Sequence, residues 1–337
     1  MNTSNVVKAV QKKTVFHKIS LRRFAPIPLV TAFTFALLTY SPTVSASVIR
    51  SLELCAKKLI PSLFPFMVTA QLFFSLGASE LVAKILGVSF EKLFGISGVG
   101  ASAFLLGALC GLPLGGKCAL ELYKKGYITR SECERLAAMS TNAGIGFTVA
   151  GVGGALLGNI RLGYTVYFVQ ITAQIAVGML LKPHRNDRLI APITNETSYQ
   201  PFLSSISSAV SSSAIGTVTV CGYVTFFGVI SDLTLSLCET LGVGAPLRLV
   251  LVSLTELTCA CNEIKIYLSS IEPTIRNFAF SALFFAFGFS GLSVHMQLSA
   301  IASETDIRIK NVILTKLLCG AVAIPLGYLA TLLFNVK

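Results

Sequence analysis

The stretch CGLPLGGKCALELYKKGYITRSE, residues 110–132, poses the question that decides the fold. Its first residues end a run, 93–116, that carries no charged side chain. A plain membrane-spanning helix would avoid the cluster found here, which consists of Gly111, Pro113, Gly115, Gly116 and then Lys117. Irregular backbone inside a membrane must find partners within the protein or face a water-filled cavity. The cluster therefore predicts the turn of a re-entrant helical hairpin or a broken helix.

The composition of the whole chain points to a membrane protein. Of its 337 residues, 53% are hydrophobic and only 12% are charged, and the mean hydropathy is +0.75. Soluble domains carry about 25% charged residues, so this chain lacks the polar surface of a soluble globule. The net charge of +12 is attributed to Lys and Arg that flank membrane spans and set their orientation. No nucleic-acid partner is predicted.

Uncharged runs divide the chain into membrane-embedded segments. Because about 20 apolar residues cross a bilayer as a helix, the runs predict roughly eight to ten embedded elements. The runs are 24–49, 59–79, 93–116, 136–160, 162–181, 197–231, 249–255, 277–303 and 317–336. The expected fold is an all-α polytopic membrane protein that consists of two repeats. The repeats are expected to be inverted relative to each other and to contain re-entrant helical hairpins.

The polar segments suggest how the chain is organised. A basic N-terminal segment, 1–23, precedes a first transmembrane helix, 24–49. The first membrane repeat, 50–181, and the second, 202–337, are joined by a polar linker, 182–201. The sequence TVSASV near the end of the first run also fits a cleaved signal peptide. The length of that run favours a retained helix with the N-terminus in the cytoplasm.

The second half carries an interrupted segment of its own, LTELTCACNEIK at residues 254–265. Thr255, Glu256 and Thr258 follow a short apolar run there. A carboxylate at membrane depth is costly and usually faces a cavity or a partner. Glu256 is therefore predicted to bind a solute, a coupling cation or a proton; a position at the edge of a loop is the competing interpretation. Paired interruptions in two halves are typical of a transporter site.

Two runs rich in small residues complete the predicted site. STNAGIGF, residues 140–147, and GFSGLSVHMQ, residues 288–297, interrupt otherwise apolar helices. The residues expected to contribute polar atoms or an unwound turn are Asn142, Gly144, Ser290, Ser293, His295 and Gln297. Sodium ligands, if sodium is the coupling ion, are expected among Thr141, Asn142 and Ser290. Close helix packing through small residues explains the same runs without a solute.

The sequence shows no pattern of a metal centre or an enzyme. Among nine cysteines, the pair Cys259 and Cys261 has no matching Cys or His pair at metal-ligand spacing. The glycine-rich stretch is not a phosphate loop, because Cys118 stands where Ser or Thr would follow the lysine. We therefore predict no catalytic residue, no metal and no cofactor.

The motif at residues 111–147 resembles the pattern of the nucleoside-recognition (Gate) domain membrane proteins. It is most similar to the YlbJ-like branch of sporulation integral membrane proteins, with Gly116 in place of the usual Ala. TELT, 255–258, and FSGLSVHMQ, 289–297, match the second-half pattern of that branch. The resemblance covers residues 48–335. It implies a protein of a sporulating bacterium, from a branch implicated in passing dipicolinic acid toward the forespore.

The same pattern is distantly similar to the concentrative nucleoside transporters. In that fold, two inverted repeats each hold a re-entrant hairpin and a partly unwound helix, and their tips meet at the substrate and sodium sites. The resemblance places residues 111–117 near the first tip and 255–258 near the second. Leu-Pro-Leu at 112–114 replaces the Gln-Thr/Ser-Glu of those transporters, which puts a nucleoside substrate in doubt. An aromatic dicarboxylate would suit Lys117 and the hairpin amides.

We therefore expect a transporter in the bilayer of the bacterial cell or forespore. Its solute is predicted to be small and polar, anionic or heteroaromatic, and either dipicolinate-like or nucleoside-like. Coupling to Na⁺ or H⁺ and assembly into a homo-oligomer are both compatible with the sequence. The competing interpretation is a membrane scaffold or assembly factor for spore-envelope maturation, which transports nothing.

Overall fold

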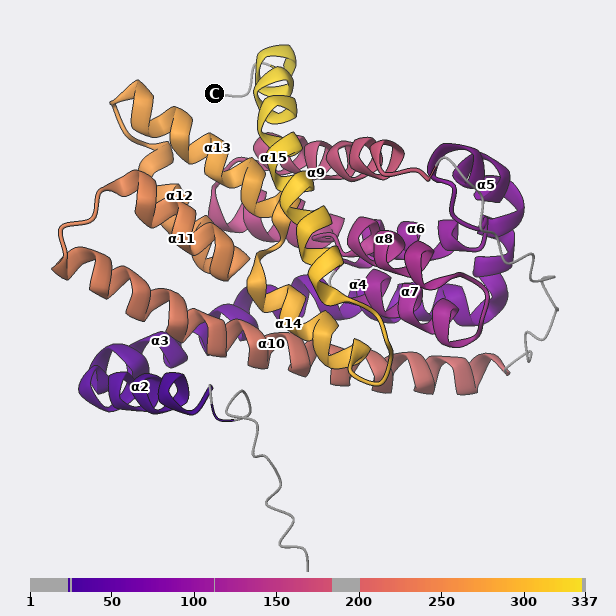
Figure 1. Cartoon of the computed structure of the whole chain (residues 1–337), viewed down its shortest axis with the longest axis horizontal. Helices are drawn as coiled ribbons and strands as arrows, with labels where there is room; N and C mark the ends of the chain where they lie inside the picture. Colours follow the sequence, from indigo (N-terminus) through magenta and orange to yellow (C-terminus); the bar gives the residue numbers. More distant parts are fainter. Residues whose placement is uncertain (1–23, 25, 112, 184–200, 335–337) are drawn as a thin grey trace, which may run out of the picture. The chain divides into compact units, whose positions relative to one another are not determined.

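The structure is a computed structural model that describes residue 24 and residues 26–111, 113–183 and 201–334. These residues form helices and connecting turns, with no strand among them (Figure 1). The chain divides into two compact units, Met1–Val44 and Ser45–Lys337. The predicted first helix, 24–49, consists of two helices, α2 (Pro26–Thr39) and α3 (Ser41–Leu54), with Tyr40 between them.

The first half of the larger unit begins with apolar helices interrupted by π-helical turns. After α3 come η2 (Cys55–Leu59), α4 (Ile60–Phe73), η3 (Phe74–Ala78) and α5 (Ser79–Phe94). A pair of short helices follows, α6 (Gly100–Cys110) and α7 (Leu114–Lys124). Then come α8 (Arg130–Ser140), η4 (Gly146–Leu156) and the long helix α9 (Ile160–Leu180). A capping box between Thr129 and Glu132 fixes the start of α8.

The second half also contains a pair of short helices, a broken helix and a long helix. It contains α10 (Phe202–Thr240), α11 (Ala245–Thr255), α12 (Leu257–Leu268), α13 (Pro273–Phe289), α14 (Gly291–Ala302) and α15 (Ile309–Phe334). Each half thus holds a hairpin of two short helices, then a helix that breaks and resumes, then a long helix. That the two halves are repeats of one another, and inverted, stays a prediction. Most of the predicted linker lies outside the described residues, at 184–200.

The outer surfaces of the helices match a lipid environment. In the part of the chain that the structure describes, five helical stretches are long and apolar enough to cross a membrane: Ser41–Phe94, Ile160–Leu180, Phe202–Thr240, Pro273–Ala302 and Ile309–Leu333. Large apolar side chains are turned outward on them; Val218 on α10 is 70% exposed and Leu332 on α15 is 80% exposed. In water such surfaces would favour association, whereas lipid solvates them. The predicted all-α polytopic membrane fold is confirmed.

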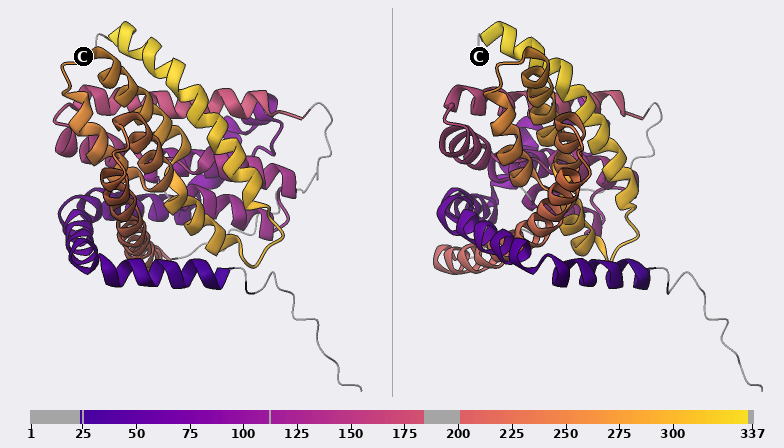
Figure 2. Two further views of the ribbon diagram at one scale, coloured as in Figure 1. Left: turned by 60° about the vertical axis from the view of Figure 1, so that its left-hand side comes forward. Right: turned by 90° about the vertical axis from the view of Figure 1, so that its left-hand side faces the viewer.

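A tightly packed crossing of three long helices supports the interior of the larger unit. Helix α15 packs against both α13 and α9, and runs past α13 as one continuous helix (Figure 2). At the crossing of α13 and α15, a Cβ atom added to Gly288 would lie 2.6 Å from the Gly320 Cα. Small residues thus let the two backbones touch, as in many membrane helix pairs. This contact fixes the end of α13 beside the centre of α15.

Candidate functional site

The glycine cluster of the first hairpin brings its backbone against the break after α8. Residues 141–144 are not helical. Gly111, at the tip, has φ 83° and ψ −157°, a conformation that essentially only glycine adopts. A Cβ atom added to Gly111 would lie 2.5 Å from the Gly144 N, and one added to Gly115 would lie 2.2 Å from the Ser140 O. The cluster therefore permits direct backbone contact between the hairpin and the broken helix.

The second hairpin turns at a single residue, Glu256. This residue has extended backbone angles, φ −143° and ψ 129°, and both ends α11 and caps α12. Its Oε2 accepts a hydrogen bond from the Cys259 N at 2.7 Å, and its Oε1 accepts one from the Thr258 Oγ1 at 3.1 Å. A carboxylate at a helix N-terminus is favoured by the free N–H groups and the helix dipole. Glu256 is thus an N-cap as well as a buried carboxylate.

The break between α13 and α14 lies against this second tip. Ser290 adopts φ 75°, and no other non-glycine residue in the described ranges has a positive φ. Gly291 follows with φ 76°, and a Cβ atom there would lie 3.2 Å from the Thr255 O. The Thr255 Oγ1 also lies 2.8 Å from the Ser231 Oγ of α10. Each hairpin tip therefore abuts a helix break of its own half.

Hydrogen bonds from the long helices join the two breaks. The Thr141 O accepts from the Lys316 Nζ at 2.8 Å and from the Ser290 Oγ at 3.4 Å. Gln170 of α9 donates to the Ala143 O at 2.6 Å and accepts from the Ala143 N at 3.3 Å. These bonds satisfy backbone groups that the break in α8 leaves without helical partners.

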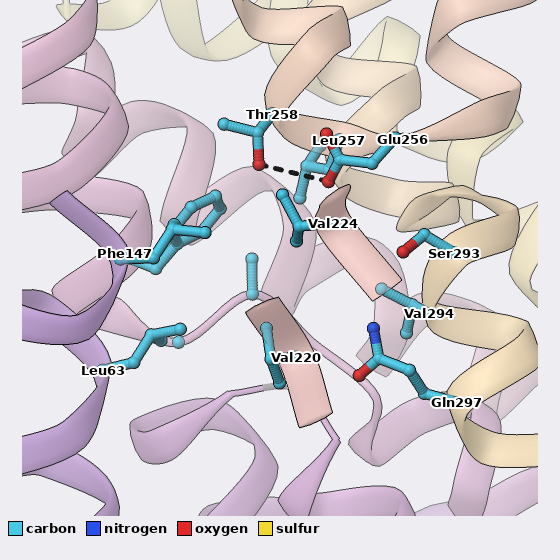
Figure 3. Close-up of a pocket in the computed structure, with 13 residues that line it drawn as sticks. Leu63, Phe147, Val220, Val224, Glu256, Leu257, Thr258, Ser293, Val294 and Gln297 are labelled. Carbon is cyan, nitrogen blue, oxygen red and sulfur yellow. Dashed lines mark hydrogen bonds between the residues drawn. The ribbon is translucent and has the colours of Figure 1, made fainter. Parts of the chain in front are cut away.

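A small cavity lies between the second hairpin and α14, with α10 along one side (Figure 3). Four polar side chains line it, Glu256, Thr258, Ser293 and Gln297. The Ser293 Oγ and the Gln297 Oε1 are buried without a hydrogen-bond partner among the described residues. Apolar walls come from several elements: Leu59, Leu63, Ala143, Gly144, Phe147, Val220, Val224, Leu257 and Val294. The cavity therefore combines an apolar interior with a few unpaired polar atoms.

The cavity has a volume of about 40 Å³. A water molecule needs roughly 10–15 Å³ of such space, so the cavity has room for about three waters. Pockets for organic ligands of drug size measure roughly 300–1,000 Å³. The cavity is therefore too small for such a ligand in this structure, and a larger solute requires the second hairpin and α14 to separate.

The structure gathers part of the predicted site and leaves part elsewhere. The cavity lining includes Gly144, Glu256, Thr258, Ser293 and Gln297. Asn142 and Ser290 lie at the helix breaks, Thr255 lies at the second tip and His295 lies inside α14; none of the four lines the cavity. The Asn142 Nδ2 donates to the Met139 O at 2.8 Å, and its Oδ1 has no partner in the described ranges.

The first-hairpin residues predicted to bind the solute do not line the cavity. Gly111, Pro113, Gly115 and Gly116 are buried at the contact with the end of α8. The side chain of Lys117 is 42% exposed, and its Nζ lies 3.9 Å from the Glu121 Oε1 one helical turn away. His295 is buried, with its Nε2 3.1 Å from the Phe289 O. A role for Lys117 or His295 in solute binding stays a prediction.

Two long helices contribute residues that the sequence analysis did not single out. Lys316 is fully buried, although it precedes the uncharged run 317–336. Gln170 and Gln174 are also fully buried, and the Gln174 Nε2 donates to the Gly288 O at 3.3 Å. The sequence signal for a buried Lys316 was its position shortly after the apolar residues Val312, Ile313 and Leu314. The helix begins earlier than the uncharged run, at Ile309, and so carries Lys316 inside.

Comparison with known proteins gives one informative match. The chain is 28% identical over 291 residues to the sporulation integral membrane protein YlbJ of Bacillus subtilis strain 168. The aligned region covers 78% of this chain and 71% of that protein. This chain is an integral membrane protein. No family model and no solved structure matches it. The match supports the predicted resemblance to the YlbJ-like branch, while the resemblances to the Gate domain and to concentrative nucleoside transporters stay predictions.

Proposed function

We propose that the protein carries a small polar solute across a bacterial membrane and binds it at the cavity beside Glu256. The observation that supports this most is the pair of unpartnered polar atoms, the Ser293 Oγ and the Gln297 Oε1. A buried polar group without a hydrogen bond costs about 1–3 kcal/mol. A bound solute would supply the missing partners.

The chemistry of the lining favours a solute that donates hydrogen bonds. Among the described residues of the lining, Glu256 is the one charged side chain. The carboxylate of Glu256 and the amide oxygen of Gln297 would accept bonds from hydroxyl or N–H groups. Phe147, Val220 and Val224 offer an apolar wall for a ring. A neutral heteroaromatic, nucleoside-like solute suits this lining better than a dipicolinate-like dianion, which Glu256 would repel.

Transport requires the closed cavity to open to each side of the membrane in turn. Gly111, Ser290 and Gly291, which have positive φ, are among the positions at the tips and breaks where the backbone departs from helix. Hinge motion of the hairpins about these points would separate the second tip from α14. Irregular backbone that lines an internal cavity is the arrangement found in transporters with broken helices.

The similarity to the Bacillus subtilis protein suggests where this activity is used. The name of that protein describes sporulation and an integral membrane location. We propose that the present chain acts in a membrane of a sporulating cell. A scaffold or assembly factor would share this location without moving a solute.

Transport is tested with the purified chain in proteoliposomes, using a panel of radiolabelled nucleosides and dipicolinate. We expect saturable uptake of at least one nucleoside-like solute and no saturable uptake of dipicolinate. The Gln297→Leu variant should lower uptake by about fivefold, because one hydrogen bond to a neutral group contributes about 1 kcal/mol and leucine cannot make it.

The matched control is Met296→Leu, one residue earlier on the same helix and 40% exposed. It should leave uptake unchanged. If folded protein moves no solute of the panel, the scaffold interpretation replaces the transporter. If dipicolinate alone is moved, the class of solute inferred from Glu256 is wrong.

A further inference from the structure

Lys316 is a basic side chain buried in the interior of the larger unit without a counter-ion among the described residues. Its side chain is fully buried on α15. No ion pair joins it to a carboxylate in the described ranges. A lysine ammonium has three donors and is strongly hydrated in water, so its burial without a specific partner is costly. Its position needs a physical explanation that packing alone does not give.

The partner of Lys316 is the backbone at the end of α8. Its Nζ donates to the Thr141 O at 2.8 Å, and the Ser290 Oγ reaches the same oxygen at 3.4 Å. Thr141 directly follows α8, and Ser290 directly follows α13. Two helices therefore end beside the ammonium. The C-terminal end of a helix carries partial negative charge on its free carbonyl groups, so a cation is stabilised there.

Such a place is where transporters with broken helices hold their coupling cation. Carbonyl groups of an unwound stretch and the C-terminal ends of half-helices coordinate Na⁺ in those proteins. Here the corresponding carbonyl, that of Thr141, is taken by an ammonium that belongs to the chain itself. A second cation at this oxygen would be repelled by the first.

We propose that Lys316 is a built-in cation that replaces a coupling Na⁺ at the crossing of the two helix breaks. The ammonium neutralises the helix ends of α8 and α13 and holds the breaks together. The wild-type chain therefore does not bind Na⁺ there, and removal of the ammonium creates a site for a monovalent cation. This inference does not depend on the solute, and its test uses none.

The test compares thermal unfolding of the detergent-purified full chain in sodium chloride and in choline chloride at equal ionic strength. The wild type should unfold at the same temperature in both salts. Lys316→Met and Lys316→Ala should unfold at a lower temperature than the wild type in choline and should be stabilised by sodium. A ligand present at one hundred times its Kd stabilises by about 2.7 kcal/mol, so the sodium effect is measurable.

Two further variants separate this role from a general effect of salt. Lys310→Ala removes an exposed lysine from the same helix and should behave as the wild type in both salts. Lys316→Arg keeps a cation and should remain insensitive to sodium. The proposal is overturned if the wild type itself is stabilised by sodium over choline. It is overturned equally if the Lys316→Met and Lys316→Ala variants fold without a sodium response, or fail to fold in either salt.

Discussion

The backbone of Gly111 lies directly against that of Gly144. Gly111 is the tip of the first hairpin, and Gly144 is the last residue of the break that follows α8. A Cβ atom on Gly111 would lie 2.5 Å from the Gly144 N, and one on Gly144 would lie 2.8 Å from the Cys110 C. In the second half, Gly291 similarly meets the tip at Thr255 and Glu256. Contact between a tip and a break is therefore a feature of both halves.

We expect Gly111→Ala to destabilise the protein strongly. A residue with a side chain would be strained at these φ and ψ angles, which costs about 1–3 kcal/mol. The added Cβ atom would also overlap the backbone of Gly144, which cannot move independently. Thermal unfolding of the detergent-purified variant measures the effect. Gly126→Ala is the control, because it also has a positive φ, of 76°, but open space around its Cβ position. Equal losses for the two variants would show that the tip contact contributes nothing.

Gly116→Ala should be tolerated much better than Gly111→Ala. The Cβ atom at Gly116 would lie 2.8 Å from the Leu298 Cδ1, at the end of a flexible side chain, and 2.7 Å from the Thr141 Oγ1, a buried hydroxyl that donates to the Ala137 O at 2.6 Å. Gly116 lies inside α7, where alanine is intrinsically favoured over glycine by about 1 kcal/mol. This gain offsets part of the cost of moving the two side chains, so the loss of unfolding free energy should be smaller than that of Gly111→Ala. An equal loss would contradict this argument.

The sequence was sufficient to predict where the backbone is irregular, but not which side chains contact these points. Breaks at Gly111, Glu256 and Ser290 follow from local chemistry, because glycine, proline and a charged residue interrupt apolar runs. The buried position of Lys316 does not follow, because a lysine at the edge of an apolar run also fits a helix end that reaches the interface. Only the tertiary fold places the α15 residue beside Thr141, 175 residues away in sequence.

The carboxylate of Glu256 has two roles that substitution can separate. Glu256→Ser keeps an N-cap oxygen for α12 and removes the charge from the cavity. We expect near-normal thermal stability and a loss of solute uptake of at least about tenfold, since hydrogen bonds to charged groups contribute about 1.5–3 kcal/mol. Asn159→Ala, which removes the N-cap of α9, is the control. It should lower stability and spare uptake; a loss of stability alone in Glu256→Ser would make Glu256 purely structural.

Lys117 offers a direct comparison between the sequence-based prediction and the geometry. Its ammonium is partly exposed and faces Glu121 at 3.9 Å rather than the cavity. Exposed pairs of this kind contribute about 0–1 kcal/mol. We therefore expect Lys117→Ala to change neither uptake nor the unfolding temperature appreciably. A selective loss of uptake in proteoliposomes, with stability intact, would restore Lys117 as a solute-binding residue.

Glu134 should control the acid stability of the contact between α8 and the start of α15. Burial tends to raise the pKa of this carboxyl group, but hydrogen bonds from the Asn311 side chain, the Arg308 N–H and Arg130 outweigh it, and the pKa is lowered. The Asn311 Nδ2 lies 2.6 Å from the Glu134 Oε2 and the Arg308 N lies 2.9 Å from the Oε1. Because the charged form is favoured in the folded state, its stabilisation is complete above the unfolded pKa, which is about 4.3.

That stabilisation is lost as the pH falls from the unfolded pKa through the lower folded value. The unfolding temperature of the wild type should therefore drop steeply below about pH 4.3. Glu134→Gln should be less stable at neutral pH and show a flatter decline in acid, because it has no charge to lose. Glu53→Gln, on an exposed residue of α3, should keep the wild-type profile. Parallel pH profiles for the wild type and Glu134→Gln would assign the acid transition to other groups.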